Sequence, residues 1–159
     1  MKKTGVILLP LFISISFCLD LTSGGPLSKN QLAMDVTHYN LQLKVDPYRQ
    51  TISGIVIITF KLFNKTEELE IDLKDGYTVS GASVNGMNLA FDHEDNKIMI
   101  DNPGLELFTP HYLEIKYGGR PPVAKRPPWD GGFIWEKSKD GHYWIGVSCQ
   151  TNGAHIWYP

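Results

Sequence analysis

The fold is decided by residues 38–63, which read HYNLQLKV (38–45), a turn at Asp46-Pro47, and then TISGIVIITFKLF (51–63). Apolar side chains occupy every second position of the first stretch: Tyr39, Leu41, Leu43 and Val45. This period of two predicts a β-strand with one buried face. Residues 51–63 are rich in β-branched side chains and apolar on both faces at their centre, which predicts a strand in the interior of a sheet.

The rest of the chain repeats this pattern, with turn residues between short strand-like stretches. The predicted strands cover residues 69–73, 77–84, 87–91, 97–100, 112–117, 133–135, 143–148 and 154–158. Asn85-Gly86 is the strongest hairpin signal, and residues 92–96 (DHEDN) predict a polar turn. No helical period exceeds one turn. The sequence therefore predicts an all-β fold, a saddle-like antiparallel β-sandwich.

Composition limits the possible functions. The chain has 159 residues, of which 42% are hydrophobic, and a formal net charge of -2. Disordered and coiled-coil proteins are excluded by this composition. Nucleic acid is not expected as a partner, because no basic block is present. The length allows one domain, which is too short for a sandwich together with a separate catalytic domain.

The N-terminus has the pattern of a secretory signal peptide, predicted over residues 1–18. Lys2 and Lys3 precede an apolar run, VILLPLFISISF (6–17), that is too short to span the roughly 30 Å of a bilayer core. A polar linker is expected at 19–31 and the folded domain at 32–159. Export to the periplasm or the extracellular space follows. Cleavage after Cys18 is one reading, and lipidation of Cys18, which would anchor the protein to a membrane, is the other.

Known catalytic and metal-binding motifs are missing from the sequence. It has no Gly-rich phosphate loop and no GxSxG motif. His93-Glu94 resembles the start of HExxH, but Lys97 stands where the second His is needed. We therefore expect no metal ligand and no catalytic residue in this chain. The acids at 67–72 are expected on an exposed polar face, His38 and His111 at half-exposed strand ends, and Cys149 in the core.

A segment rich in proline and glycine, residues 118–132, interrupts the strands. It contains two Pro-Pro pairs, which favour extended backbone. We expect an ordered surface strap, anchored by the large side chains of Trp129 and Phe133.

Two stretches resemble a known family. The first is MDVTHYNLQLKVDPYRQTISGIVIITFKL (34–62), and the second, 127–159, combines PPWDGGF, WIGVSCQ and AHIWYP. Together they are similar to the opening domain of the zinc-dependent aminopeptidase N family, in its secreted bacterial form. The resemblance implies a saddle-shaped sandwich that a thermolysin-like catalytic domain follows. It also implies that the parent protein removes N-terminal residues from peptides.

The resemblance implies one substrate-binding residue, Gln150. It lies nine residues before Pro159, at the family position of a Gln or Glu that helps to bind the free amino terminus of a peptide. An amide oxygen can accept a hydrogen bond from an ammonium group, although Gln150 can also be read as a polar residue at a strand edge. Thr151 departs from the Ala or Pro that is common beside it.

The family's catalytic parts have no equivalent in residues 1–159: its exopeptidase loop, its HExxH helix, its third zinc ligand and its catalytic Tyr. We therefore expect a truncated chain that is inactive alone and forms one wall of the substrate cleft. Zinc is expected in the missing catalytic domain, which would be the partner of this one. Residues 156–159 are expected as an uncovered aromatic strand that this partner would bury.

An alternative function belongs to a different class of protein. A freestanding exported sandwich could bind peptide or carbohydrate through four exposed aromatic side chains: Trp129, Trp135, Trp144 and Trp157. A purely scaffolding role is a third reading. A coding frame that continues into an HExxH motif would favour the peptidase.

Overall fold

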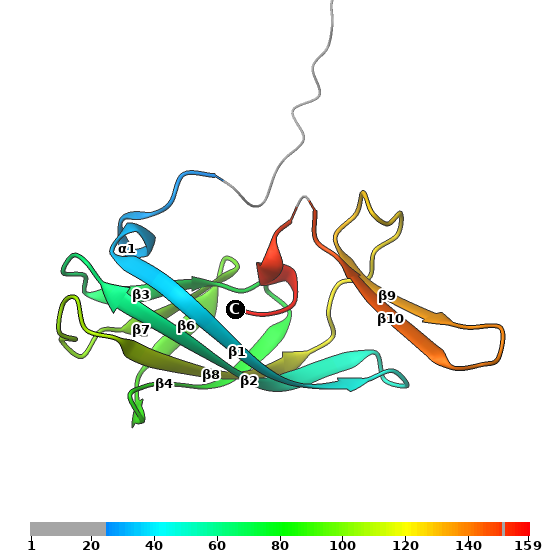
Figure 1. Ribbon diagram of the computed structural model, residues 1–159, viewed down its shortest axis with the longest axis horizontal. Coiled ribbons are helices and arrows are strands. Elements are labelled where there is room, and N and C mark those ends of the chain that lie inside the picture. Colours follow the sequence, from blue (N-terminus) through cyan, green and yellow to red (C-terminus); the bar gives the residue numbers. More distant parts are fainter. Residues whose placement is uncertain (1–24, 151) are drawn as a thin grey trace, which may run out of the picture.

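The structure is a computed structural model that describes residues 25–150 and 152–159, and its sheets are antiparallel throughout (Figure 1). The predicted signal peptide, Cys18 and the linker up to residue 24 lie outside the described residues. In the part of the chain that is described, no helix is long and apolar enough to cross a membrane. The predicted all-β sandwich is confirmed.

The larger sheet has five strands. Their order across the sheet is β1 (Met34–Asp46), β2 (Thr51–Leu62), β8 (His111–Gly119), β4 (Tyr77–Val84) and β5 (Met87–Asn88). β2 lies between β1 and β8, as its two apolar faces predict. A bulge between Val36 and His38 bends β1. At Gly54 the backbones of β1 and β2 approach so closely that a Cβ atom would lie 2.1 Å from the Gln42 carbonyl oxygen.

The smaller sheet packs against the larger one and closes the core. It has three strands in the order β3 (Glu68–Asp72), β7 (Lys97–Asp101) and β6 (Phe91–Glu94). The largest fully buried side chains come from both sheets and include Ile52, Ile58, Phe60, Leu62, Leu69, Ile98, Ile100, Leu113 and Ile115. Every second residue of these strands faces the partner sheet, so the alternating apolar side chains form the core of the sandwich.

Two tight turns join pairs of adjacent antiparallel strands. Asn85 and Gly86 have φ of 51° and 84° and close the hairpin between β4 and β5, which confirms the predicted turn. The second turn is shorter than expected. Only Asp95 and Asn96, with φ of 52° and 61°, form it, and β6 and β7 flank it directly. His93 therefore lies in a strand, not in a turn.

A short helix precedes the sandwich and begins within the predicted linker. α1 (Lys29–Leu32) begins with a capping box, in which the Ser28 hydroxyl accepts from the Gln31 amide N–H and the Gln31 side chain accepts from the Ser28 N–H. Ala33, which follows the helix, is buried. The folded region therefore reaches N-terminal of residue 32.

The expected uncovered strand at the C-terminal end is wrong. Residues 154–156 form a 3₁₀ turn, η1 (Ala154–Ile156), and the Ile156 side chain is only 2% exposed. Two buried phenols hold this segment: Tyr77 donates to the Ile156 carbonyl at 2.8 Å, and Tyr117 donates to the Trp157 carbonyl at 2.6 Å. Ile156 is thus buried, and Trp157 and Tyr158 are partly buried against the core of the two sheets.

The third sheet is the hairpin of β9 (Gly132–Lys137) and β10 (Tyr143–Ser148), which projects to the right in Figure 1. The proline-rich strap leads into it and is ordered, since the Phe133 N–H donates to the Pro122 carbonyl at 2.7 Å. Phe133 is buried, as expected of an anchor. Trp129 is not an anchor, because its side chain is 70% exposed.

Candidate functional site

Gln150 is the second residue after β10 (Tyr143–Ser148) and is exposed to solvent. β10 ends at Ser148, so Gln150 occupies a turn and not a strand edge. The same turn is closed by the Gly153 N–H, which donates to the Cys149 carbonyl at 2.9 Å. The amide group of Gln150 is thus accessible to a ligand, and its role in binding a peptide amino terminus stays a prediction.

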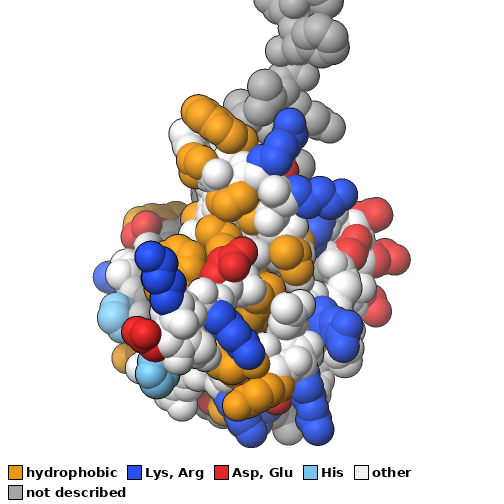
Figure 2. Space-filling model, turned by 90° about the vertical axis from the view of Figure 1, so that its right-hand side faces the viewer, with side chains coloured by type: hydrophobic (Ala, Val, Ile, Leu, Met, Phe, Trp, Pro, Cys, Tyr) orange, Lys and Arg blue, Asp and Glu red, His pale blue; other side chains and the backbone are white. Residues whose placement is uncertain are grey.

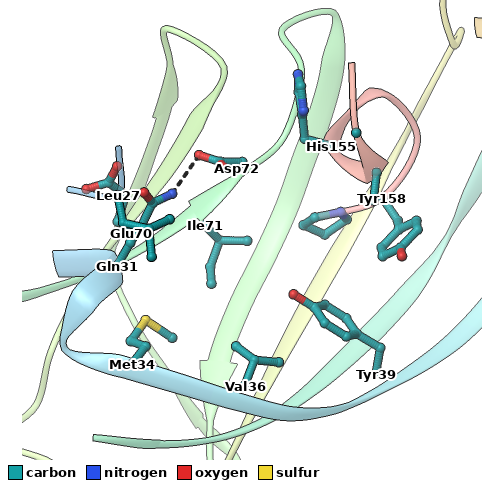
Figure 3. A pocket seen from close by; sticks show the side chains of 13 residues that line it. Leu27, Gln31, Met34, Val36, Tyr39, Glu70, Ile71, Asp72, His155 and Tyr158 are labelled. Carbon is teal, nitrogen blue, oxygen red and sulfur yellow. Dashed lines mark hydrogen bonds between the residues drawn. The ribbon is translucent and has the colours of Figure 1, made fainter. Parts of the chain in front are cut away.

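A pocket lies elsewhere, in the hollow between α1, β1, β3 and the C-terminal segment (Figure 3). Its volume is about 410 Å³, within the range of small-molecule sites. It is lined by Leu27, Gln31, Met34, Val36, Tyr39, Glu70, Ile71, Asp72, Gly153, Ala154, His155, Tyr158 and Pro159. Gln150 is not among these residues.

Glu70 corrects the expectation of an exposed acidic face on β3. Its side chain is 5% exposed and forms an ion pair with Lys97. It also accepts from the Ser28 hydroxyl at 2.6 Å. Burial alone would raise the pKa of Glu70, but the hydrogen bonds from Lys97 and Ser28 and the charge of Lys97 outweigh burial and lower it. Glu70 is therefore a buried carboxylate that ties α1 and β7 to β3.

Asp72, two residues further along β3, does face solvent as expected. It accepts a hydrogen bond from the Gln31 side-chain amide at 3.0 Å, drawn as the dashed line in Figure 3. In the β3–β7 register it lies opposite Lys97. Because the ammonium of Lys97 already bonds Glu70, two carboxylates share one neighbouring cation at this edge of the pocket.

Aromatic and imidazole side chains form the opposite wall. The rings of Tyr39 and Tyr158 meet edge to face, with centroids 5.7 Å apart. Burial raises the pKa of Tyr39, and the Tyr158 and Asp72 side chains raise it further, so the phenol is neutral at pH 7. Burial also lowers the pKa of His155; Asp72 opposes this shift, and Lys74 adds to it. His155 is therefore mostly a neutral imidazole at pH 7.

The other residues weighed for chemistry do not come together. Among residues 25–150 and 152–159, no group of three or more His, Cys, Asp or Glu side chains could hold a metal ion. His93 bonds the Leu73 carbonyl at 3.0 Å. His111 is buried, contrary to expectation, with one ring nitrogen 3.0 Å from the Asn85 amide. Cys149 is a free thiol and half-buried, so it is less enclosed than predicted.

None of the residues that line this pocket was assigned a functional role from the sequence. One signal was present, because Ser28 and Gln31 have the spacing of a capping box and predict a helix start that would place Gln31 near the domain. The burial of Glu70 had no local signal, since its partners are 42 and 27 residues away in sequence.

Comparisons with known proteins identify the fold. No protein-family model and no curated protein matches the chain. Among solved structures, a two-domain M1 zinc metallopeptidase variant bound to L-arginine is 26% identical, with a TM-score of 0.56 over 70% of this chain and 28% of that one. The M1 zinc metallopeptidase from Deinococcus radiodurans is 25% identical, with a TM-score of 0.56 over 69% and 27%.

A third match is a likeness of fold. Yeast LTA4 hydrolase in complex with bestatin is 20% identical, with a TM-score of 0.66 over 96% of this chain and 24% of that one. The chain thus spans about a quarter of the length of these structures. The fold and the sequence likeness together match this chain to the N-terminal domain of a zinc metallopeptidase of the M1 aminopeptidase family.

Proposed function

We propose that the chain works as the N-terminal domain of an exported zinc aminopeptidase that removes N-terminal residues from peptides, and that it forms one wall of the substrate cleft. The observation that carries the proposal is the match of the β-domain to M1 zinc metallopeptidases at up to 26% identity. The exposed position of Gln150, two residues after the end of β10, supports the proposal of a substrate contact there.

In this proposal Gln150 binds the amino terminus of the peptide. Its side-chain oxygen accepts a hydrogen bond from the substrate ammonium, and the neutral amide does so without the desolvation cost of a carboxylate. Such a bond to a charged group contributes about 1.5–3 kcal/mol. It holds the peptide end in a fixed position and thereby selects substrates with a free amino terminus.

The described residues do not fit a zinc ion, since no three potential ligands come together. The proposal therefore assigns zinc to a catalytic domain of the same polypeptide, where the metal activates water and polarises the peptide carbonyl. The chain alone is proposed to be inactive. This domain would contribute binding and orientation, and no step of bond cleavage.

Localisation is part of the same proposal. A signal peptide over residues 1–18 would direct the protein to the periplasm or the extracellular space. A membrane would be a partner only if Cys18 were lipidated. Nucleic acid is not proposed as a partner, in line with the formal net charge of -2.

The test has two arms. In the first, the purified chain is incubated with zinc and with peptide p-nitroanilides, and we expect no release of nitroaniline. In the second, residues 25–159 replace the matching domain of the Deinococcus radiodurans enzyme. Gln150→Ala in this chimera should lower kcat/KM about 10- to 100-fold, mainly through KM, whereas Gln42→Ala, an exposed control on β1, should leave it unchanged.

Two results would contradict the proposal. One is aminopeptidase activity of the purified chain with tightly bound zinc. The other is a folded, zinc-loaded chimera in which Gln150→Ala and Gln42→Ala behave alike. N-terminally acetylated substrates give a further check, because blocking the ammonium should remove the difference between Gln150→Ala and the parent chimera.

A binding module is the second candidate function, with fewer exposed aromatic side chains than expected from the sequence. Trp135 and Trp157 pack against the core, so they are not part of an exposed aromatic binding surface. Trp144 is 58% exposed, and its ring lies over Gly146, where an added Cβ would meet it at 3.4 Å. Figure 2 shows hydrophobic side chains between Lys and Arg on this end of the molecule. Binding of oligosaccharides or extended peptides by the chain alone, lost in Trp144→Ala, would favour this function.

A further inference from the structure

The pocket of Figure 3 combines an acidic edge with an apolar floor. Met34 and Val36 of β1 and Ile71 of β3 form the floor, and Asp72 lies at the edge. Among its lining residues, all of them described, are two carboxylates and no Lys or Arg. The wall side chains His155 and Tyr39 are neutral at pH 7, so the formal charges of the lining are negative.

The cations outside the lining do not neutralise both acids. Lys97 bonds Glu70 directly, and it lines the adjoining hollow together with Lys74. Glu70 is thereby paired and buried. Asp72 has one hydrogen bond from an uncharged amide, that of Gln31, and its second carboxylate oxygen is free to accept from a ligand.

The walls suit a ligand that carries its charge on an apolar body. The Tyr39 hydroxyl points into the pocket, and the rings of Tyr39 and Tyr158 stand side by side at one wall (Figure 3). The Tyr39 hydroxyl oxygen can accept a hydrogen bond from an ammonium group, and the floor residues can cover methylene or ring carbons. A carboxylate or phosphate would face the carboxylate of Asp72, while the nearest cation, Lys97, is already bonded to Glu70. A bare metal ion would lack a third ligand.

We propose that this pocket binds an organic cation, a primary amine with an alkyl or aryl body. The ammonium group donates to Asp72, and the apolar body lies on Met34, Val36 and Ile71 between α1 and the C-terminal segment. The site is separate from Gln150, and the proposal does not depend on the peptidase function.

The experiment is a titration of the purified chain at pH 7 with three ligands of the same length: hexylamine, hexan-1-ol and hexanoate. Binding is followed by calorimetry and by the NMR shifts of the Met34 and Ile71 methyl groups. We expect hexylamine to bind about tenfold more tightly than hexan-1-ol, because both can donate a hydrogen bond to Asp72 but only the ammonium group also pairs its charge with the carboxylate. Hexanoate should not bind.

Two variants test the assigned residue. Asp72→Asn should reduce the affinity for hexylamine to that for hexan-1-ol and leave the affinity for hexan-1-ol unchanged. The unchanged alcohol affinity also shows that the pocket is still folded. Asp101→Asn removes an exposed carboxylate at the end of β7, outside the pocket lining, and should change neither affinity.

Several results would overturn the proposal. They are equal affinities for the amine and the alcohol in the parent chain, no binding of the amine up to about 10 mM, methyl shifts outside the pocket, or the same loss in both variants. Loss of alcohol binding in Asp72→Asn while the amine still binds would also overturn it.

Discussion

Removal of the two buried phenolic hydroxyls should release the C-terminal segment from the sheet. Tyr77→Phe and Tyr117→Phe keep both rings but delete the bonds to the Ile156 and Trp157 carbonyls. Each lost bond leaves a carbonyl without its partner, at a cost of about 1–3 kcal/mol. The two rings are in contact, with centroids 5.5 Å apart, so the costs need not add. We expect the double variant to lose about 2–4 kcal/mol.

The assay is urea unfolding, with hydrogen exchange as the local probe. With an m-value of about 2 kcal/mol/M, the expected loss lowers the midpoint by about 1–2 M urea. The Trp157 amide, which donates to the Ala154 carbonyl, should exchange faster. Tyr112→Phe, on the exposed face of β8, is the control and should change stability by less than about 0.5 kcal/mol. Equal midpoints for the double variant and this control would refute the reasoning.

Three further outcomes are expected. Lys97→Met leaves the buried Glu70 carboxylate without its cation and should cost about 2–4 kcal/mol at pH 7. Because the pKa of Glu70 is lowered in the folded state, this stabilisation is present above about pH 4.3 and is lost as pH falls through the lowered pKa, so the urea midpoints of variant and parent should converge as the pH is lowered through that range. The two buried phenols have raised pKa values, chiefly through burial, so the parent should lose stability as pH rises above about 10, and the double Phe variant should lose less over the same alkaline titration. Gly54→Ala places a Cβ atom against the Gln42 carbonyl and should cost about 1–3 kcal/mol or more by thermal unfolding, whereas Gly25→Ala meets nothing within 4 Å and should be neutral.

Local patterns predicted the parts of the fold that local physics decides. The alternation at residues 39–45 correctly predicted the strand β1, but its apolar face is only partly buried: Leu41 and Leu43 pack against the core, whereas Tyr39 and Val45 are exposed. The two apolar faces of residues 51–63 become the interior strand β2. Asn85-Gly86 closes the predicted hairpin, because both residues tolerate the positive φ that the turn requires. The family resemblance agrees with the likeness of the chain to solved M1 zinc metallopeptidases.

Burial that depends on distant partners could not be read from the sequence. Glu70 alternates with apolar neighbours like any exposed acid, and only its contacts with Lys97 and Ser28 make it a buried residue. Residues 154–158 have β-prone composition, yet their backbone folds into a turn because Tyr77 and Tyr117 offer hydrogen bonds from another part of the chain. The pocket depends on both of these arrangements, so no local sequence pattern could predict it.

The strand order of the larger sheet has a consequence for biosynthesis. β2 can pair with β1 as soon as both strands have been synthesised. Its other edge stays unpaired until β8 has been made, and β8 begins only at His111. At a synthesis rate of about 5–20 residues per second, residues 63–110 take about 2–10 s to emerge. During that time an apolar strand presents an unpaired edge, the feature that recruits other chains into aggregates. A nascent chain with this topology benefits from a holding chaperone until the second half has been made.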